Sequence, residues 1–80
     1  MIELYQAEWC PHSHRVRQRL TELGLDFVAH QVPVDPSERT ELESATGQRS
    51  IPTLVLDDSV IGGDDEILAM LEHVHDPLIR

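Results

Sequence analysis

The chain has 80 residues, 40% of them hydrophobic, and a formal net charge of −9, because 15 acidic residues face only six basic ones. A chain of this length forms one compact unit without a second domain, and its acidity argues against binding to nucleic acid or to an anionic membrane. Apolar runs such as residues 54–56 are too short to cross a bilayer. The first residues lack the basic leader of a signal peptide. The sequence therefore predicts a soluble, cytoplasmic, single-domain protein over residues 1–80.

The charge pattern leaves two interpretations open. All six basic residues are arginines, and lysine is absent. The first interpretation is an ordinary acidic protein of the cytosol. The second is adaptation to high salt, in which carboxylates replace lysine across a strongly hydrated surface, as in a halophile.

The first predicted strand covers residues 2–6, where apolar and polar side chains alternate. A helix follows from Pro11, a residue favoured at the first helical position. It ends at Gly24, which suits the left-handed conformation common after helices. Three apolar residues recur between them at helical spacing: Val16, Leu20 and Leu23.

Proline and glycine mark the ends of the later elements. Pro33 ends the second strand, Gly47 stops the second helix, and Gly62-Gly63 precedes the last helix. Asp64 and Asp65 are expected to cap that helix. The predicted bounds are a strand at 27–32, a helix from residue 36 to about 45, a strand at 51–56, a hairpin turn at 57–59 and a short strand at 60–61. The apolar stripe of the last helix comprises Ile67, Leu68, Leu71 and Val74.

The order of these elements is strand, helix, strand, helix, strand, strand, helix. The first strand–helix–strand unit predicts a parallel pair joined by a right-handed crossover, and the closing hairpin must be antiparallel. A four-stranded mixed sheet with helices on both faces follows. This is an α/β architecture of thioredoxin type.

The single cysteine, Cys10, lies between the first strand and the first helix, in the sequence Cys10-Pro11-His12-Ser13. With one cysteine no internal disulfide can form. Free N–H groups and the helix dipole at this position favour the thiolate, which is the nucleophilic form. Pro11 is expected to leave the sulfur exposed at the loop edge, with Trp9 as an apolar wall beside it. The alternative is an inert, buried cysteine.

The segment Cys10-Pro11-His12-Ser13 resembles the active site of the glutaredoxins, which reads C-P-x-C or C-x-x-S. Residues 46–52 are similar to the family's T-G-x-R-T-V-P segment, whose proline is cis and lies against the cysteine. Gly62-Gly63-Asp64-Asp65 resembles its G-G-x-D turn, which holds the γ-glutamyl end of glutathione. The resemblance covers essentially the whole chain and implies a glutaredoxin-type thioredoxin fold. The same fold also begins the glutathione transferases.

The resemblance assigns catalytic roles to Cys10, Pro11 and Ser13, and it implies glutathione or a related small thiol as co-substrate. The backbone of Ile51, before Pro52, would pair with the peptide-like thiol as an added strand. The small-thiol site as a whole comprises Trp9, Gln48, Arg49, Ile51, Pro52, Asp64 and Asp65.

Each of these roles has an electrostatic basis and a simpler alternative. Asp65 would accept a hydrogen bond from the ammonium group, and amides at the helix start would receive the α-carboxylate. Gln48 and Arg49 would hold the far carboxylate. Against these roles, Asp64 and Asp65 are explained by capping alone, and Arg49 by a solvated charge. Ser13 either hydrogen-bonds the sulfur or is an ordinary polar residue of the first turn.

Two residues depart from the family pattern. Ala7 stands where many glutaredoxins have a lysine, and the acidic Glu8 opposes thiolate formation. Both predict a Cys10 less activated than is usual in the family. Relatives that share an iron–sulfur cluster have glycine in place of Pro11, which argues against a cluster here.

A metal site is not expected. Cys10, His12 and His14 alternate along one helical turn, so their side chains point apart, and no distant cysteine completes a set. His73 and His75 are expected on the surface near the end of the last helix.

Three functions remain to be weighed. The leading one is thiol–disulfide exchange by the monothiol route, in which Cys10 acts on protein or small-molecule mixed disulfides together with a small thiol. The second is a stand-alone domain like the N-terminal part of a glutathione transferase, although 80 residues leave no room for that enzyme's helical domain. The third is a non-catalytic binding or adaptor domain of the same fold.

Overall fold

Four strands, Ile2–Gln6 (β1), Val28–Gln31 (β2), Thr53–Leu56 (β3) and Ser59–Gly62 (β4), form one sheet in the order β2-β1-β3-β4. The computed structural model of the protein describes residues 1–74; His75 and the side chain of Val74 lie outside the described part. β1 and β2 are parallel, whereas β1–β3 and β3–β4 are antiparallel. The predicted four-stranded mixed sheet is confirmed.

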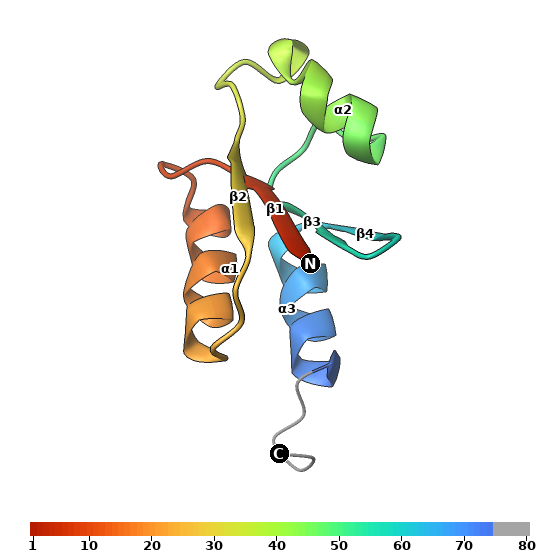
Figure 1. Ribbon diagram of the computed structural model, residues 1–80. Coiled ribbons are helices and arrows are strands. Elements are labelled where there is room, and N and C mark those ends of the chain that lie inside the picture. The colour runs from red at the N-terminus through yellow and green to blue at the C-terminus, as the bar shows by residue number, and fades with distance from the viewer. Residues whose placement is uncertain (75–80) are drawn as a thin grey trace.

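Two long helices cover one face of this sheet. Helix α1 (Pro11–Glu22) and helix α3 (Asp64–Val74) lie side by side along it (Figure 1). The core between the helices and the sheet consists of Leu4, Val16, Leu20, Leu54, Ile67 and Leu71, each at most 1% exposed. Burying one such side chain contributes about 1.5–3 kcal/mol. This core fixes the N-termini of α1 and α3 at the same end of the molecule.

The other face is covered only at one end, by helix α2 (Thr40–Thr46). Tyr5 and His30 stack there with ring centroids 4.5 Å apart. A hollow of about 240 Å³ is lined by these two rings and by Leu42 of α2, which is itself buried. Helices therefore lie on both faces, as predicted, and α2 is the smaller cover (Figure 1).

The predicted second helix is two elements in the structure. A 3₁₀ turn, η1 (Pro36–Glu38), comes first, and Arg39 (φ −84°, ψ 52°) separates it from α2. The side chain of Asp35 caps η1 by accepting the Ser37 N–H at 2.9 Å. The chain therefore changes direction at Arg39, which periodicity alone does not reveal.

Strand bounds also shift by one or two residues. β2 is shorter than predicted at both ends. β3 begins after Pro52, which lacks the N–H needed for a ladder hydrogen bond. The hairpin turn has two residues, and Asp57 adopts a positive φ of 54°, so Ser59 already pairs with Leu56. This conformation is the one that two-residue hairpins require.

The start of α3 differs from the predicted cap. The carbonyl of Gly63 accepts the Ile67 N–H at 3.0 Å, so the helical hydrogen bonds begin at Gly63. Asp64 and Asp65 lie in the first turn rather than at the cap position. Their charge is still favourable there because of the helix dipole, and their side chains are free for other contacts.

Candidate active site

Cys10 caps the N-terminus of α1. Its backbone is extended (φ −86°, ψ 120°), and Pro11 follows as the first helical residue. The Cys10 N–H donates to the carbonyl of Ala7 at 3.2 Å, and the Cys10 carbonyl accepts the His14 N–H at 3.0 Å. The thiol therefore lies where the first N–H groups of the helix have no intrahelical acceptor.

The surroundings of the Cys10 thiol favour the thiolate overall. Burial raises the pKa of Cys10, but hydrogen bonds from the backbone N–H and the hydroxyl of Ser13, and from the backbone N–H of His12, bring this pKa below its ordinary value. The carboxylate of Asp64 acts in the opposite direction. The net lowering is the direction that the position at the helix start predicts.

Cys10 is less accessible than the sequence suggests. It is 7% exposed, so the expectation that Pro11 leaves the sulfur exposed is wrong. The hydrogen bond from the Cys10 N–H to the Ala7 carbonyl closes a tight turn before α1, so Pro11 alone does not determine the exposure of the sulfur. The apolar groups in contact with solvent beside the thiol are Trp9, which is 58% exposed, and Pro11.

Ser13 supports both the loop and the sulfur. Its side chain is fully buried, and its hydroxyl oxygen accepts the Ala7 N–H at 3.3 Å. The same hydroxyl lowers the pKa of Cys10 after the raising effect of burial and the lowering effect of the Ser13 backbone. The hydrogen bond from the Ser13 hydroxyl to the thiol stays a prediction, which this lowering of the Cys10 pKa supports.

The acid that opposes the thiolate is Asp64, not Glu8. The carboxylate of Glu8 accepts a hydrogen bond from the Gln6 amide at 3.0 Å and lies 3.4 Å from Nε of Arg17. It is not among the groups that shift the pKa of Cys10. Ala7 is buried, and Arg17 donates to its carbonyl at 3.3 Å and also to the amide oxygen of Gln6. The positive charge of Arg17 therefore neutralises Glu8 beside the loop.

Asp64 joins the N-termini of α1 and α3. Its Oδ2 lies 2.9 Å from Nδ1 of His12 and 2.6 Å from Nη1 of Arg15. His12, and to a smaller extent Arg15, lower the pKa of Asp64 against the opposing effect of burial. We call these three residues the clasp. It brings the G-G-x-D turn to the thiol loop.

Asp65 is much more exposed than Asp64. Its side chain is 87% exposed, against 14% for Asp64, and its one ion pair within the described residues is with Arg15 at 3.3 Å. Asp64 is thus committed to contacts inside the protein. Asp65 retains oxygen atoms that an approaching ammonium group can reach.

The segment before β3 reaches the same end of the molecule. The Ile51–Pro52 peptide bond is cis, and the Pro52 carbonyl accepts the Gly63 N–H at 2.9 Å. Within residues 1–74, the backbone N–H and C=O of Ile51 take part in no hydrogen bond. This peptide group remains available to an added strand.

Gln48 and Arg49 are both engaged within the protein. The Gln48 amide oxygen accepts from the Thr53 hydroxyl at 3.4 Å, and a Cβ on Gly62 would overlap the Gln48 amide. Arg49 forms two hydrogen bonds with Glu43, at 2.6 and 3.2 Å, and this contact raises the pKa of Arg49. The Arg49 guanidinium is therefore partly occupied by an ion pair at the surface, and its contact with a ligand stays a prediction.

Sequence reasoning missed two contributors to this site, His12 and Arg15, and it also missed the buried Arg39. His12 and Arg15 were not assigned to Asp64, although their spacing of three residues places them on one face of α1. Arg39 was not noticed, because an arginine among acidic and polar residues looks like a surface charge. A contact between residues 12 and 64 depends on which two helix ends meet in space.

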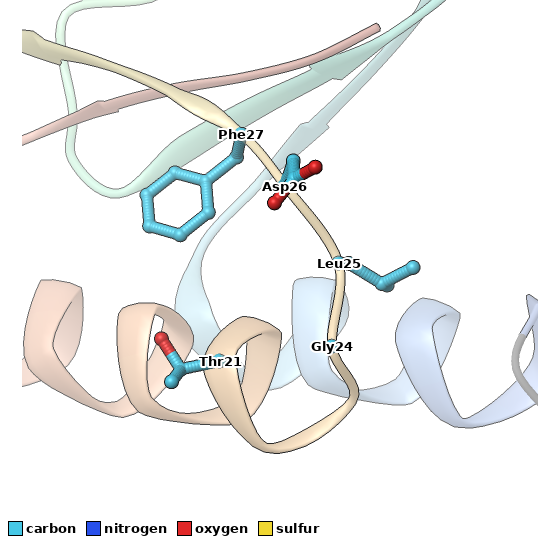
Figure 2. Close-up of a pocket in the computed structure, with 5 residues that line it drawn as sticks. All are labelled: Thr21, Gly24, Leu25, Asp26 and Phe27. Carbon is cyan, nitrogen blue, oxygen red and sulfur yellow. The ribbon is translucent and has the colours of Figure 1, made fainter.

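A hollow lies at the opposite end of α1 (Figure 2). It has a volume of about 320 Å³ and is lined by Thr21, Gly24, Leu25, Asp26 and Phe27. Among these five residues there is no thiol and no cationic group. Within residues 1–74, no cluster of three ligating side chains could hold a metal ion. No described helix is long and apolar enough to span a membrane.

The sheet order, the core between the sheet and its helices, and the position of Cys10 at the start of α1 are those of a thioredoxin-like domain. A family model of the glutaredoxins matches residues 2–61. The chain is 31% identical over 71 residues to glutaredoxin 3 of Escherichia coli strain K12, covering 86% of this chain and 83% of that protein. It is 29% identical over 69 residues to a glutaredoxin of Pseudomonas aeruginosa, covering 86% and 82%. The chain belongs to the glutaredoxin family.

Solved structures give the same fold. Glutathione transferase E6 from Drosophila melanogaster superposes with a TM-score of 0.83 at 22% identity, over 96% of this chain and 36% of that one. A glutathione transferase homologue from Burkholderia, solved with bound glutathione, superposes with a TM-score of 0.77 at 26% identity, over 95% and 39%. The chain therefore spans little more than a third of the length of these transferases.

Proposed function

We propose that this protein catalyses thiol–disulfide exchange by a monothiol route, with Cys10 as nucleophile and glutathione or a related small thiol as co-substrate. The observation that carries the proposal is the Cys10 thiol at the start of α1, whose pKa the hydrogen bonds from Ser13 and His12 lower against the effect of burial. A disulfide partner within the chain is impossible, because Cys10 is its only cysteine.

The reaction has two balanced steps. The Cys10 thiolate attacks the small-thiol sulfur of a mixed disulfide, and the substrate leaves as a thiolate that takes a proton from water. Cys10 then carries the small thiol in a disulfide. A second small-thiol anion attacks that small thiol's sulfur, which releases the symmetric small disulfide and restores the Cys10 thiolate.

Three features would hold the small thiol in line for this exchange. The free N–H and C=O of Ile51 offer the pairing of an added strand. The exposed carboxylate of Asp65 suits an ammonium group, and the start of α3 suits an α-carboxylate. Trp9 and Pro52 would supply apolar contact. Gln48 and Arg49 would assist at the far carboxylate, and Arg49 would then exchange Glu43 for the ligand.

The proteins and structures that resemble this chain support glutathione as the small thiol. Its relatives are glutaredoxins, and one structure of the same fold holds glutathione. γ-Glutamylcysteine carries the same ammonium and α-carboxylate groups and would use the same contacts. The cytoplasmic location and the mixed-disulfide substrates stay predictions, as does the extent of the domain over residues 1–80.

The test is turnover of a mixed disulfide of glutathione with a small aliphatic thiol. We expect turnover by the wild-type protein, none above background for Cys10→Ser, and unchanged turnover for Thr21→Ser at the far end of α1. Mass spectrometry should find one glutathione on wild-type Cys10 and none on the serine variant. Replacing glutathione by γ-glutamylcysteine in the same assay identifies the preferred thiol.

One observation favours a second candidate. The Asp64 carboxylate raises the pKa of Cys10, after the stronger effect of burial, and Ala7 supplies no cation in place of the family's lysine. A binding or adaptor domain would tolerate such a thiol. Absence of turnover by a folded wild-type protein, with both small thiols, would favour the adaptor and overturn the proposed enzyme.

A further inference from the structure

Arg39 is a buried cation at the joint between η1 and α2. It is only 6% exposed. Its guanidinium donates three hydrogen bonds to backbone carbonyls: from Nε to Pro33 at 2.8 Å, from Nη2 to Val34 at 3.1 Å and from Nη1 to Arg49 at 2.8 Å. None of the ion pairs in the described residues includes Arg39. The side chain therefore joins two loops that are separate in the sequence.

Stability alone is a poor explanation for this arrangement. Burying a charge is costly unless it is paired, and apolar side chains of similar volume stabilise a protein as well or better. A guanidinium is distinguished by its rigid planar fork of five donors, which fixes the relative position of the groups it contacts. Here those groups are the loop that leaves β2 and the segment that enters β3.

The second of these loops is the one that would bind the small thiol. Hydrogen bonds hold its backbone at almost every residue. The Gln48 N–H donates to the Thr46 hydroxyl at 3.2 Å, the Ser50 carbonyl accepts from Thr53 at 2.9 Å, and the Pro52 carbonyl accepts from Gly63. Among residues 1–74, only Arg39 donates a hydrogen bond to the Arg49 carbonyl. Ile51 is left free between these fixed points.

We infer that Arg39 is a positioning residue for thiol binding: by holding the Arg49 carbonyl, it orients the free peptide groups of Ile51 toward the small thiol. The inference rests on the proposed function. It assigns to Arg39 an effect on binding of the small thiol and none on the chemistry of Cys10. Cys10 lies on a different loop, and Arg39 is not among the groups that shift the pKa of Cys10.

The experiment compares Arg39→Met and Arg39→Lys with the wild-type protein. Arg19→Met serves as the matched control, since Arg19 pairs with Glu22 and Glu72 on the surface, away from the thiol. We expect each Arg39 variant to raise KM for the small thiol about tenfold, the factor that about 1.4 kcal/mol represents. We expect kcat at saturation and the Cys10 pKa to stay unchanged, and Arg19→Met to alter none of these.

A second measurement does not depend on activity. Backbone ¹⁵N relaxation should show order parameters near 0.85 for residues 49–51 in the wild type and below about 0.6 in Arg39→Lys, with the helices unchanged. Unchanged order and unchanged KM in folded Arg39→Lys would overturn the inference. A tenfold fall in kcat together with a shifted Cys10 pKa in the Arg39 variants would overturn the inference as well. Failure of the proposed function is distinct, because it shows as absent turnover in the wild type while the relaxation test still decides on Arg39.

Discussion

The two ends of α1 differ in how their backbone hydrogen-bonding groups are satisfied. At the C-terminal end, Leu23 and Gly24 donate to Arg19 and Thr21, and Leu25 donates to Leu20, so local backbone contacts close the helix. At the N-terminal end, the free N–H groups of His12 and Ser13 face the sulfur of Cys10 instead. A hollow of about 320 Å³ lies at the closed end (Figure 2).

In this protein, helix N–H groups without a backbone acceptor locate the candidate site better than cavity volume does. A helix end becomes reactive when its free N–H groups have a side chain to stabilise and no carbonyl to occupy them. The C-terminal end of α1 offers space with its backbone groups already paired. The N-terminal end holds a nearly buried thiol whose anion is stabilised.

Removing the Ser13 hydroxyl should have the largest effect on the N-terminal end of α1. In Ser13→Ala the Cys10 pKa should rise, and exchange at neutral pH should fall about tenfold, because hydrogen bonds to a charged group contribute about 1.5–3 kcal/mol. The Ala7 N–H would lose its acceptor, which should lower the free energy of unfolding by about 1–3 kcal/mol. Thiolate absorbance against pH and urea unfolding provide the measurements.

Gly24→Ala is the matched change at the other end. Gly24 has a φ of +71°, so alanine should cost about 1 kcal/mol of stability and leave the Cys10 pKa unchanged. If Gly24→Ala shifted that pKa as much as Ser13→Ala does, the contrast between the two ends would be lost.

Asp64→Asn should change the Cys10 pKa in the direction opposite to Ser13→Ala. Removing the carboxylate should lower the Cys10 pKa further, since Asp64 opposes the thiolate. Breaking the clasp should cost about 1 kcal/mol, because partly exposed ion pairs contribute about 0.2–1 kcal/mol each. Unfolding curves and thiolate titration on the same samples would show both effects, and a raised Cys10 pKa would contradict the assignment of Asp64.

The same variant has a defined pH dependence. The pKa of Asp64 is lowered in the folded protein, chiefly by His12, so the clasp stabilises the fold fully above the unfolded value of about 3.9. That stability is lost as the pH falls from there through the folded pKa. The wild type and Asp64→Asn should therefore differ in stability at pH 6 and converge in strong acid.

Salt should have the smallest effect, and it acts on the whole surface. With a net charge of −9, carboxylates repel one another in dilute buffer, and the Debye length falls from about 10 Å at 0.1 M to about 3 Å at 1 M. We expect Tm to rise by about 2–4 °C in molar sodium chloride, equivalent to about 0.5 kcal/mol for a domain of this size. The gain should be larger for Asp64→Asn, which has no clasp for salt to weaken.

A parallel series in sodium sulfate separates two causes. A gain in chloride reflects screening, whereas a gain in sulfate alone reflects stronger apolar burial. An unchanged Tm across the chloride series would mean that the carboxylates are already well spaced. The interpretation of a surface adapted to high salt should then be dropped.

Local signals along the chain predict the order of the strands and helices, apart from the split of the second helix at Arg39, and they predict the mixed sheet and the place of Cys10 before α1. These rest on local signals: alternation in β1, the Pro11 start and Gly24 end of α1, and motifs written in contiguous residues. The family followed from the same short segments. Local backbone preferences act within a few residues, so they can be read along the chain.

The contacts between charged groups and the burial of individual side chains depend on tertiary packing. Glu8 is next to Cys10 in the sequence but points to Arg17, whereas Asp64, more than fifty residues away, acts on the thiol. The burial of Cys10 and the placement of Arg39 against the Arg49 carbonyl are equally nonlocal. Such contacts depend on how the helices and loops are packed around the core. The spacing of two residues along the chain does not give the distance between them in the folded protein.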